Sequence, residues 1–184
     1  LFLLQAAMVL RQREMKEELK SFRFNPHVAQ LKQLAKILPF TLTSAQERVF
    51  REIQADMVTS RPMNRLVQGD VGSGKTVVAL HALVMACGSG CQTALMVPTE
   101  ILAEQHYLNL APLLRAVGLK AVLLTSGGKA KDRNETLKQL ESGAAQIAIG
   151  THALIQKKVR FANLGLVIVD EQHKFGVLQR KTLL

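Results

Sequence analysis

The sequence contains no Trp, one Tyr, seven Phe and only two Cys among its 184 residues. So few aromatic side chains make a stacking platform for single-stranded bases difficult to build. Cys87 and Cys91 have no further Cys or nearby His to complete a metal set, which favours reduced thiols. The longest apolar run, Val77–Cys87, is interrupted by His81 and is shorter than the about 20 residues that cross a bilayer. We therefore expect neither a cysteine-based metal site nor a transmembrane helix.

Acidic residues are fewer than basic ones: the sequence has 14 Asp and Glu but 24 Lys and Arg, which gives a net charge of +10. A chain that is 48% hydrophobic is not a disordered tail, and its positive field favours a polyanionic partner contacted through backbone phosphates. The apolar start, Leu1–Leu10, precedes its basic residues, whereas a secretory signal places the positive charge first. Because the chain begins with Leu rather than Met, we expect a fragment of a longer protein.

The sequence pattern changes near residue 39. Residues 1–38 have apolar positions at helical spacing and predict a helical appendage, in which Asn25 and Pro26 fit an N-cap and a first helical residue. From residue 39 to 184, short runs of Val, Ile and Leu alternate with turn signals and helical stretches, which predicts an α/β domain with a parallel sheet. Right-handed crossovers would place the turns after the strands along one edge. The expected strands are 65–68, 93–97, 121–125, 146–149 and 166–169.

The segment GDVGSGKT fits the phosphate-loop pattern G-x-x-x-x-G-K-[ST]. Its glycines let successive backbone N–H groups turn toward phosphate oxygens, and the helix that follows adds the positive end of its dipole. In this pattern Lys75 reaches the β and γ phosphates, and the Thr76 hydroxyl is a ligand for Mg²⁺. The expected nucleotide-binding residues of the loop are Gly69, Asp70, Val71, Gly72, Ser73, Gly74, Lys75 and Thr76.

Two adjacent acids, Asp170 and Glu171, follow the apolar run Leu166–Val169. Carboxylates at the end of a buried strand require a chemical reason. Asp170 is suited to hold Mg²⁺, directly or through water, and Glu171 to orient and deprotonate the attacking water. The alternative is a helix N-terminus that favours acids. Beside a phosphate loop, the pair predicts hydrolysis of a nucleoside triphosphate.

Gln46 lies upstream of the phosphate loop in the segment PFTLTSAQ. Its amide can pair with both N6 and N7 of adenine, and Phe40 can stack on the same base. Thr43 and Gln46 also have the spacing of a capping box, so Gln46 could instead close the start of a helix. Phe40 could equally belong to the core. We favour the nucleotide-binding interpretation and keep the other open.

In this order, the motifs resemble the first motor lobe of superfamily 2 helicases, and most closely that of the RecG family of bacterial branched-DNA translocases. The resemblance is carried by LPFTLTSAQ (38–46), QGDVGSGKTVVA (68–79), MVPTEILAEQH (96–106), GTHALIQ (150–156) and LGLVIVDEQHKFGVLQR (164–180). The related transcription-repair coupling factors typically have an aromatic residue in place of Ser73 and D-E-E-Q at the acidic motif. Two departures from the family pattern are Lys174 in place of Arg and Ser126-Gly127 in place of Gly-Ser.

The resemblance implies a RecA-like P-loop NTPase lobe that uses ATP and Mg²⁺. It implies that Gln172 and His173 sense the nucleotide state, with His173 joining Lys75, Asp170 and Glu171 in the catalytic set. Thr99, Thr151 and His152 are the expected DNA contacts, although isolated threonines at these positions would be ordinary helix caps.

The resemblance also implies a role for the parent protein. That role is ATP-dependent remodelling of stalled forks and Holliday junctions during recombination and repair, in the bacterial cytoplasm. The expected partners are branched or duplex DNA, a second RecA-like lobe that supplies an arginine, and a wedge domain upstream of residues 1–38; no membrane is expected.

Three alternatives remain open at this point. The parent could be a translocase of the transcription-repair coupling type, or the chain could act as a nucleotide- or DNA-binding module without turnover. An RNA helicase shares the lobe but commonly carries Asp-Glu-Ala-Asp where this chain has Gln172 and His173 after its two acids. The ordered motif set favours the branched-DNA translocase.

Overall fold

The structure is a computed structural model that describes residues 23–127 and 130–175. Its core is a sheet of four parallel strands in the order β2-β3-β1-β4. The strands are β1 (Gln92–Met96), β2 (Ala121–Leu124), β3 (Ile147–Gly150) and β4 (Leu164–Val169). The predicted α/β class with a parallel sheet is therefore confirmed, as are the four expected strands that follow the phosphate loop.

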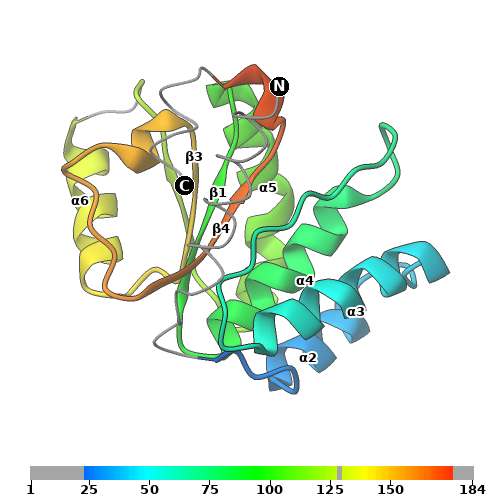
Figure 1. Cartoon of the computed structure of the whole chain (residues 1–184). Coiled ribbons are helices and arrows are strands. Elements are labelled where there is room, and N and C mark those ends of the chain that lie inside the picture. Colours follow the sequence, from blue (N-terminus) through cyan, green and yellow to red (C-terminus); the bar gives the residue numbers. More distant parts are fainter. Residues whose placement is uncertain (1–22, 128–129, 176–184) are drawn as a thin grey trace, which may run out of the picture.

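Helices cover both faces of this sheet (Figure 1). They are α2 (Ala29–Ile37), α3 (Ser44–Val58), α4 (Lys75–Gly88), α5 (Glu100–Ala116) and α6 (Ala130–Glu141), with 3-10 turns η1 (His152–Ile155) and η2 (Gln172–Lys174). Helices α4 and α5 pack on one face of the sheet, and α6 and η1 pack on the other. Within the described ranges, no helix is long and apolar enough to cross a membrane.

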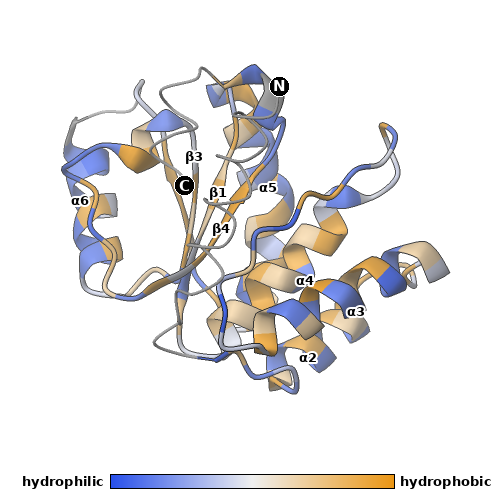
Figure 2. Cartoon of the chain, in the orientation of Figure 1, coloured by the Kyte–Doolittle hydropathy of each residue, from blue (hydrophilic) through white to orange (hydrophobic). Residues whose placement is uncertain are grey.

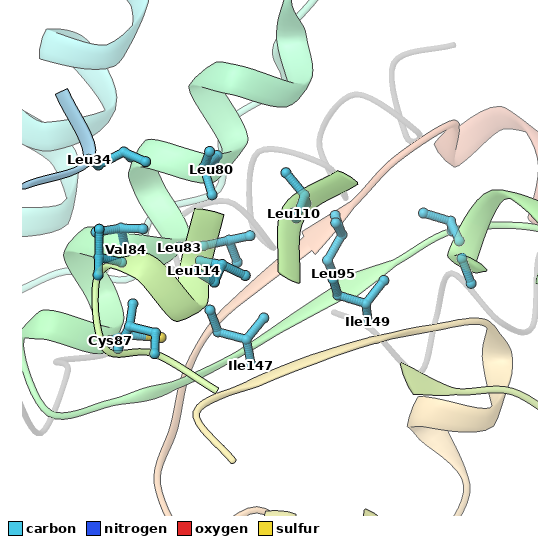
Figure 3. Close-up of a cluster of buried hydrophobic side chains, with 14 residues drawn as sticks. Leu34, Leu80, Leu83, Val84, Cys87, Leu95, Leu110, Leu114, Ile147 and Ile149 are labelled. Carbon is cyan, nitrogen blue, oxygen red and sulfur yellow. The ribbon is translucent and has the colours of Figure 1, made fainter. Parts of the chain in front are cut away.

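Alternate residues of the strands supply the two halves of the core, because successive side chains of a strand point to opposite faces. Leu95, Ile147 and Ile149 face α4 and α5, where they join a cluster with Leu83 and Leu114 (Figure 3). The residues between them along each strand join the cluster under α6 and η1. All residues of β1 and β3 are buried, as expected for central strands of a parallel sheet with helices on both faces.

Helix α4 is apolar around most of its circumference (Figure 2). It lies between the sheet and helices α2 and α3, and every residue from Leu80 to Cys87 is buried. A helix enclosed in this way holds its N-terminus, and the phosphate loop before it, at a fixed place beside the sheet. Burial also raises the pKa of the Cys87 thiol to about 12, so this cysteine stays protonated.

The predicted strand at 65–68 is wrong, since residues of this segment have neither helix nor strand structure. Side chains rather than a ladder of backbone hydrogen bonds hold it in place. Val67 packs against the cluster between α3, α4 and β4. Arg65 forms ion pairs of 2.7 Å with both Glu52 and Asp56 of α3. The chain therefore enters the phosphate loop along α3 and α4, fixed by these contacts.

The start of α2 also differs from the prediction. The helix begins at Ala29, three residues after the expected first helical residue, Pro26. The Asn25 Oδ1 atom accepts a hydrogen bond of 2.9 Å from the backbone N–H of His27. The helix starts later because Val28 has an extended backbone, with φ −66° and ψ 140°, and the Asn25 bond forms an Asx turn ahead of it.

The helical appendage is described only in its second half, because the first predicted helix falls in residues 1–22, outside the described residues. In the second half, Leu34 of α2 is fully buried and joins the same cluster as α4 and α5. Helix α2 is thus packed onto the α/β domain. A domain boundary after residue 38 stays a prediction.

Gly150 ends β3 at a point where no side chain fits. A Cβ atom added there would lie 2.1 Å from the carbonyl oxygen of Leu124 in the neighbouring strand. We expect Gly150→Ala to lower the free energy of unfolding by about 2 kcal/mol or more, because the clashing atom belongs to the backbone. Gly118→Ala is the comparison: its Cβ meets nothing within 4 Å, and only its positive φ of 77° is penalised, by about 1 kcal/mol. Equal losses in urea denaturation would contradict the packing argument.

His81 makes the stability of the fold pH-dependent. Its ring is buried, its Nδ1 atom lies 2.7 Å from the carbonyl oxygen of Val77, and burial lowers its pKa. In the unfolded chain His81 binds a proton near pH 6.5, whereas in the folded chain it stays neutral at this pH. The free energy of unfolding therefore falls as the pH drops from about 7.5 through 6.5. We expect His81→Asn to flatten this slope in urea denaturation and His27→Asn, at an exposed position, to preserve it. A slope of His81→Asn equal to wild type would contradict the assignment.

Candidate functional site

The phosphate loop joins the segment beside α3 to the start of α4. Gly72 and Gly74 have φ angles of 82° and 81°, in the left-handed region that glycine adopts without a Cβ penalty. These two turns curl the backbone, and α4 begins directly after them at Lys75. Val71 is fully exposed at the tip of the loop. The loop therefore has the curled backbone and the helix N-terminus that phosphate binding requires.

Lys75 folds back across the loop that precedes it. Its Nζ atom donates hydrogen bonds to the carbonyl oxygens of Gly69, at 2.6 Å, and Asp70, at 2.8 Å. These partners are neutral, so the positive charge of the lysine is not cancelled and can attract phosphate. Thr76 follows in the first turn of α4 with an exposed side chain, in the position predicted for a metal-binding hydroxyl.

Gln46 joins the start of α3 to the phosphate loop. Its Oε1 atom accepts from the Thr43 N–H at 3.0 Å, and its own N–H donates to Thr43 Oγ1 at 3.3 Å, which completes a capping box. Its Nε2 atom donates to the carbonyl oxygen of Ser73 at 2.9 Å. The capping box, the alternative interpretation of this pair, is thus present, with an additional bond to the loop. Contact with adenine stays a prediction for Gln46 and for Phe40, whose ring is 52% exposed.

Asp170 and Glu171 lie at the end of β4, on the edge where the strands reach their carboxyl ends. The Asp170 N–H donates to the carbonyl oxygen of Met96 at 2.9 Å, which continues the pairing of β4 with β1. Glu171 has a positive φ of 52°, a conformation that costs a residue with a Cβ about 1 kcal/mol or more. This turn redirects the chain into η2, where Lys174 Nζ lies 3.5 Å from Glu171 Oε2.

The Asp170 carboxylate is held by two hydrogen bonds. His106 Nε2, from the middle of α5, lies 3.2 Å from Oδ2, and the Glu171 N–H donates to Oδ1 at 2.9 Å. The His106 hydrogen bond is the largest of the causes that lower the pKa of Asp170, against the opposing effect of burial. Asp170 is therefore ionised at neutral pH and accepts the hydrogen bond that His106 donates.

The charge of the phosphate loop acts on the acidic pair at this edge. The charge of Lys75 is among the causes that lower the pKa of Asp170, although the two residues are far apart in sequence. Among the described residues, no three His, Cys, Asp or Glu side chains are grouped to hold a metal ion by themselves. A cation held by Asp170 and Thr76 would need phosphate oxygens to complete its shell, which is how Mg²⁺ is bound with nucleotides. The residues therefore fit Mg²⁺ in the presence of a triphosphate.

Two of the predicted DNA-contacting residues cap helices. Thr99 Oγ1 accepts from the Leu102 N–H at 3.3 Å at the start of α5, and its side chain is exposed. Thr151 Oγ1 accepts from the Ala153 N–H at 3.5 Å at the start of η1, and its side chain is buried. His152 is exposed beside it. DNA contact stays a prediction for all three, and in this structure Thr99 and His152 are the accessible ones.

The remaining predicted residues lie in η2. Gln172 is exposed, and His173 belongs to the same turn, but its side chain lies outside the described part of the chain. The end of the last motif, residues 176–180, also lies outside it. Their predicted roles in sensing the nucleotide stay predictions.

Sequence reasoning missed two residues of α5 that contact this edge. The first is His106, which belongs to the motif MVPTEILAEQH but has no spacing relation to Asp170. The second is Glu100, whose Oε1 atom accepts from the N–H groups of Ser126, at 2.9 Å, and Gly127, at 3.0 Å. A polar residue on the buried stripe of an amphipathic helix was the signal that could have identified His106.

Comparisons with known proteins agree on one family. Residues 43–184 match the DEAD/DEAH box helicase model. Proteins called ATP-dependent DNA helicase RecG are 50% identical over 183 residues in Synechocystis sp. (strain ATCC 27184 / PCC 6803 / Kazusa) and 48% identical over 184 residues in Aquifex aeolicus. Another, from Bacillus subtilis, is 52% identical over 181 residues.

These alignments cover 100%, 100% and 98% of this chain but 22%, 23% and 26% of the relatives, so the chain spans about a quarter of their length. A solved structure of RecG bound to a three-way DNA junction is similar to this one with a TM-score of 0.86 and 43% identity. The match covers 95% of this chain and 24% of that chain.

The bond from Gln46 to Ser73 predicts a separable effect on nucleotide binding. Gln46→Met has a similar side-chain length but loses the acceptor for the Thr43 N–H and the bond to the loop, whereas Thr43→Ala loses only the other half of the capping box, the Oγ1 acceptor for the Gln46 N–H. Each should lower the free energy of unfolding by about 1 kcal/mol. We expect only Gln46→Met to weaken binding of a fluorescent nucleotide several-fold, because the loop loses its anchor. Equal affinities of the two variants would contradict this role.

Proposed function

Since the chain belongs to the DEAD/DEAH box helicase family, we propose that it is the first motor lobe of an ATP-dependent DNA translocase that remodels branched DNA. The observation that carries this proposal is the curled phosphate loop at the N-terminus of α4, with Lys75 folded across it, together with Asp170 at the carboxyl end of β4. The identity of the chain to RecG proteins supports a DNA substrate. The similar structure of RecG bound to a three-way DNA junction supports a branched DNA substrate.

In the proposed site, the loop binds the triphosphate of ATP. Its backbone N–H groups and the N-terminus of α4 surround the phosphates, and Lys75 exchanges its carbonyl partners for the β and γ phosphate oxygens. Gln46 holds the loop through Ser73 and lies at the start of α3, from where its amide reads the base when it leaves the capping box. The exposed ring of Phe40 is available to stack on the adenine.

Hydrolysis depends on positioning and electrostatic stabilisation, as in phosphoryl transfer generally. Asp170 and Thr76 would hold Mg²⁺, which when bound neutralises charge on the β and γ phosphates. Glu171 orients the attacking water and accepts its proton, and its left-handed backbone supports this role, because such costly conformations cluster at functional sites. His173 follows in η2, as a sensor of the nucleotide state.

The proposed DNA surface is formed by the turns that follow β1, β2 and β3. Thr99 at the start of α5 and His152 in η1 are exposed, and the N–H groups of helix starts and turns are suitable ligands for backbone phosphates. The net charge of +10 increases the attraction of any polyanion to this surface. Because the relatives are about four times longer, we assign the catalytic arginine and the wedge to parts of the parent chain other than this one. We place the parent in the bacterial cytoplasm.

The proposal predicts that Lys75→Ala in the protein that carries this chain abolishes DNA-stimulated ATP hydrolysis. The lysine contacts the transferred phosphate, so we expect a loss on the order of 100-fold or more in a phosphate-release assay. Lys32→Ala, at an exposed position of α2, is the matched control and should hydrolyse ATP at the wild-type rate. Full activity of Lys75→Ala would overturn the assignment of the site.

The same assay distinguishes the DNA substrate. We expect stimulation of hydrolysis to be strongest with forked or three-way junction DNA, weaker with linear duplex and weakest with single strands, because so few aromatic side chains are present for base stacking. Equal stimulation by linear duplex and forks would favour a translocase of the transcription-repair coupling type.

A further inference from the structure

Helix α5 makes polar contacts with two different turns at the carboxyl edge of the sheet. Through Glu100 in its first turn it holds the backbone N–H groups of Ser126 and Gly127, after β2. Through His106 it holds Asp170, after β4. His106 lies six positions after Glu100, which corresponds to about 9 Å along a helix. One rigid element therefore spans from the proposed DNA surface to the proposed metal site.

The position of His106 favours a functional role over simple packing. Ala103, Leu110 and Leu114 are buried on the same stripe of α5, and His106 lies between them with a side chain only 14% exposed. An apolar residue would fill this place without any need for a partner. The imidazole instead reaches Asp170, 64 residues away in sequence.

The geometry at Asp170 shows what the contact does. One carboxylate oxygen accepts from His106 and the other from the backbone of Glu171, so the plane of the carboxylate is fixed from two directions. Each oxygen keeps a further lone pair for a water or a cation. Hydrogen bonds of this kind orient metal-binding groups, and their removal typically weakens metal affinity about 10- to 100-fold.

The contact of Glu100 shows how the other end of α5 is fixed. Gly127 has no Cβ, and one added there would lie 2.8 Å from Glu100 Oε2. The absence of that atom allows the carboxylate to approach two consecutive N–H groups. A phosphate that binds the N–H groups of this turn must displace the Glu100 carboxylate, and it thereby releases the first turn of α5 from this contact.

We propose that His106 is a positioning residue that couples DNA binding at the first turn of α5 to cation and nucleotide binding at Asp170. This inference rests on the proposed function. It deepens that function by naming the physical link between two of its ligands. Coupling of this kind is reciprocal: DNA should tighten binding of the nucleotide with Mg²⁺ by the same factor by which the nucleotide tightens binding of DNA.

The test measures equilibrium binding in the whole protein that carries this chain. A fluorescent ATP analogue that is not hydrolysed is titrated with Mg²⁺, with and without a forked DNA. His106→Leu removes the N–H donor but fills the stripe, and His106→Gln keeps a donor at similar reach. His27→Leu, at an exposed position before α2, is the matched control. Thermal unfolding of each variant confirms that it is folded.

We expect His106→Leu to require about 10-fold more Mg²⁺ for half-maximal binding and to lose the effect of DNA on nucleotide affinity. His106→Gln and His27→Leu should retain both within about 2-fold. Glu100→Ala should lose the effect of DNA on nucleotide affinity while keeping the wild-type Mg²⁺ requirement, because the bond between His106 and Asp170 is intact in this variant. Glu100→Ala therefore tests the link even if His106→Leu does not fold.

An effect of DNA in His106→Leu and Glu100→Ala that equals the wild-type effect would overturn the inference while leaving the proposed function in place. A wild-type protein in which DNA does not alter nucleotide binding would overturn the coupling itself. A wild-type protein that binds no nucleotide in the presence of Mg²⁺ would instead contradict the proposed function.

Discussion

The structure depends on one constraint: parallel strands bring their carboxyl ends to the same edge of the sheet. Asp170 ends β4 at this edge, and β1, which lies next to it, is followed by Thr99 and α5. The phosphate loop reaches the same edge by another route, ahead of the buried helix α4. The lysine ammonium of the loop acts electrostatically on the ionised carboxylate of Asp170, and we propose this pair as the basis of the nucleotide site.

The buried helix α4 and the exposed edge have complementary roles. Because α4 is enclosed between the sheet and helices α2 and α3, it cannot move without disturbing the core. The groups at the edge are arranged differently: within the described residues Lys75 is hydrogen-bonded to neutral carbonyl oxygens, and Asp170 keeps lone pairs free. A rigid interior thus supports polar groups that can change partners when a ligand arrives.

Much of the fold could be predicted because its signals are local. The runs that became β1, β2, β3 and β4 are apolar and short, and the turns after them were visible in the sequence. The segment containing Val67 has the same composition, but contacts of Arg65 with α3 place it outside the ladder, and no local pattern shows this. The bond from the His27 N–H to Asn25 also fits a helix starting at Pro26, but the extended backbone of Val28 delays the start of α2 to Ala29.

The candidate site was predictable where a motif encodes it and not where it depends on distant pairs. The loop and the acidic pair follow known spacings, whereas the contact between His106 and Asp170 joins residues on two elements that only the folded sheet brings together. Gln46 illustrates a third case, since one side chain satisfies its helix cap and also reaches Ser73. The capping box was visible in sequence, and the bond to the loop was not.

The central claim is that the loop and the acidic pair share one cation and one triphosphate. Electron paramagnetic resonance of Mn²⁺, used in place of Mg²⁺ with a non-hydrolysable ATP analogue, measures this most directly in the protein that carries the chain. The account predicts one nucleotide-dependent Mn²⁺ site, with phosphorus couplings, that both Thr76→Val and Asp170→Ala weaken strongly. A bound Mn²⁺ signal that either substitution leaves unchanged would contradict it.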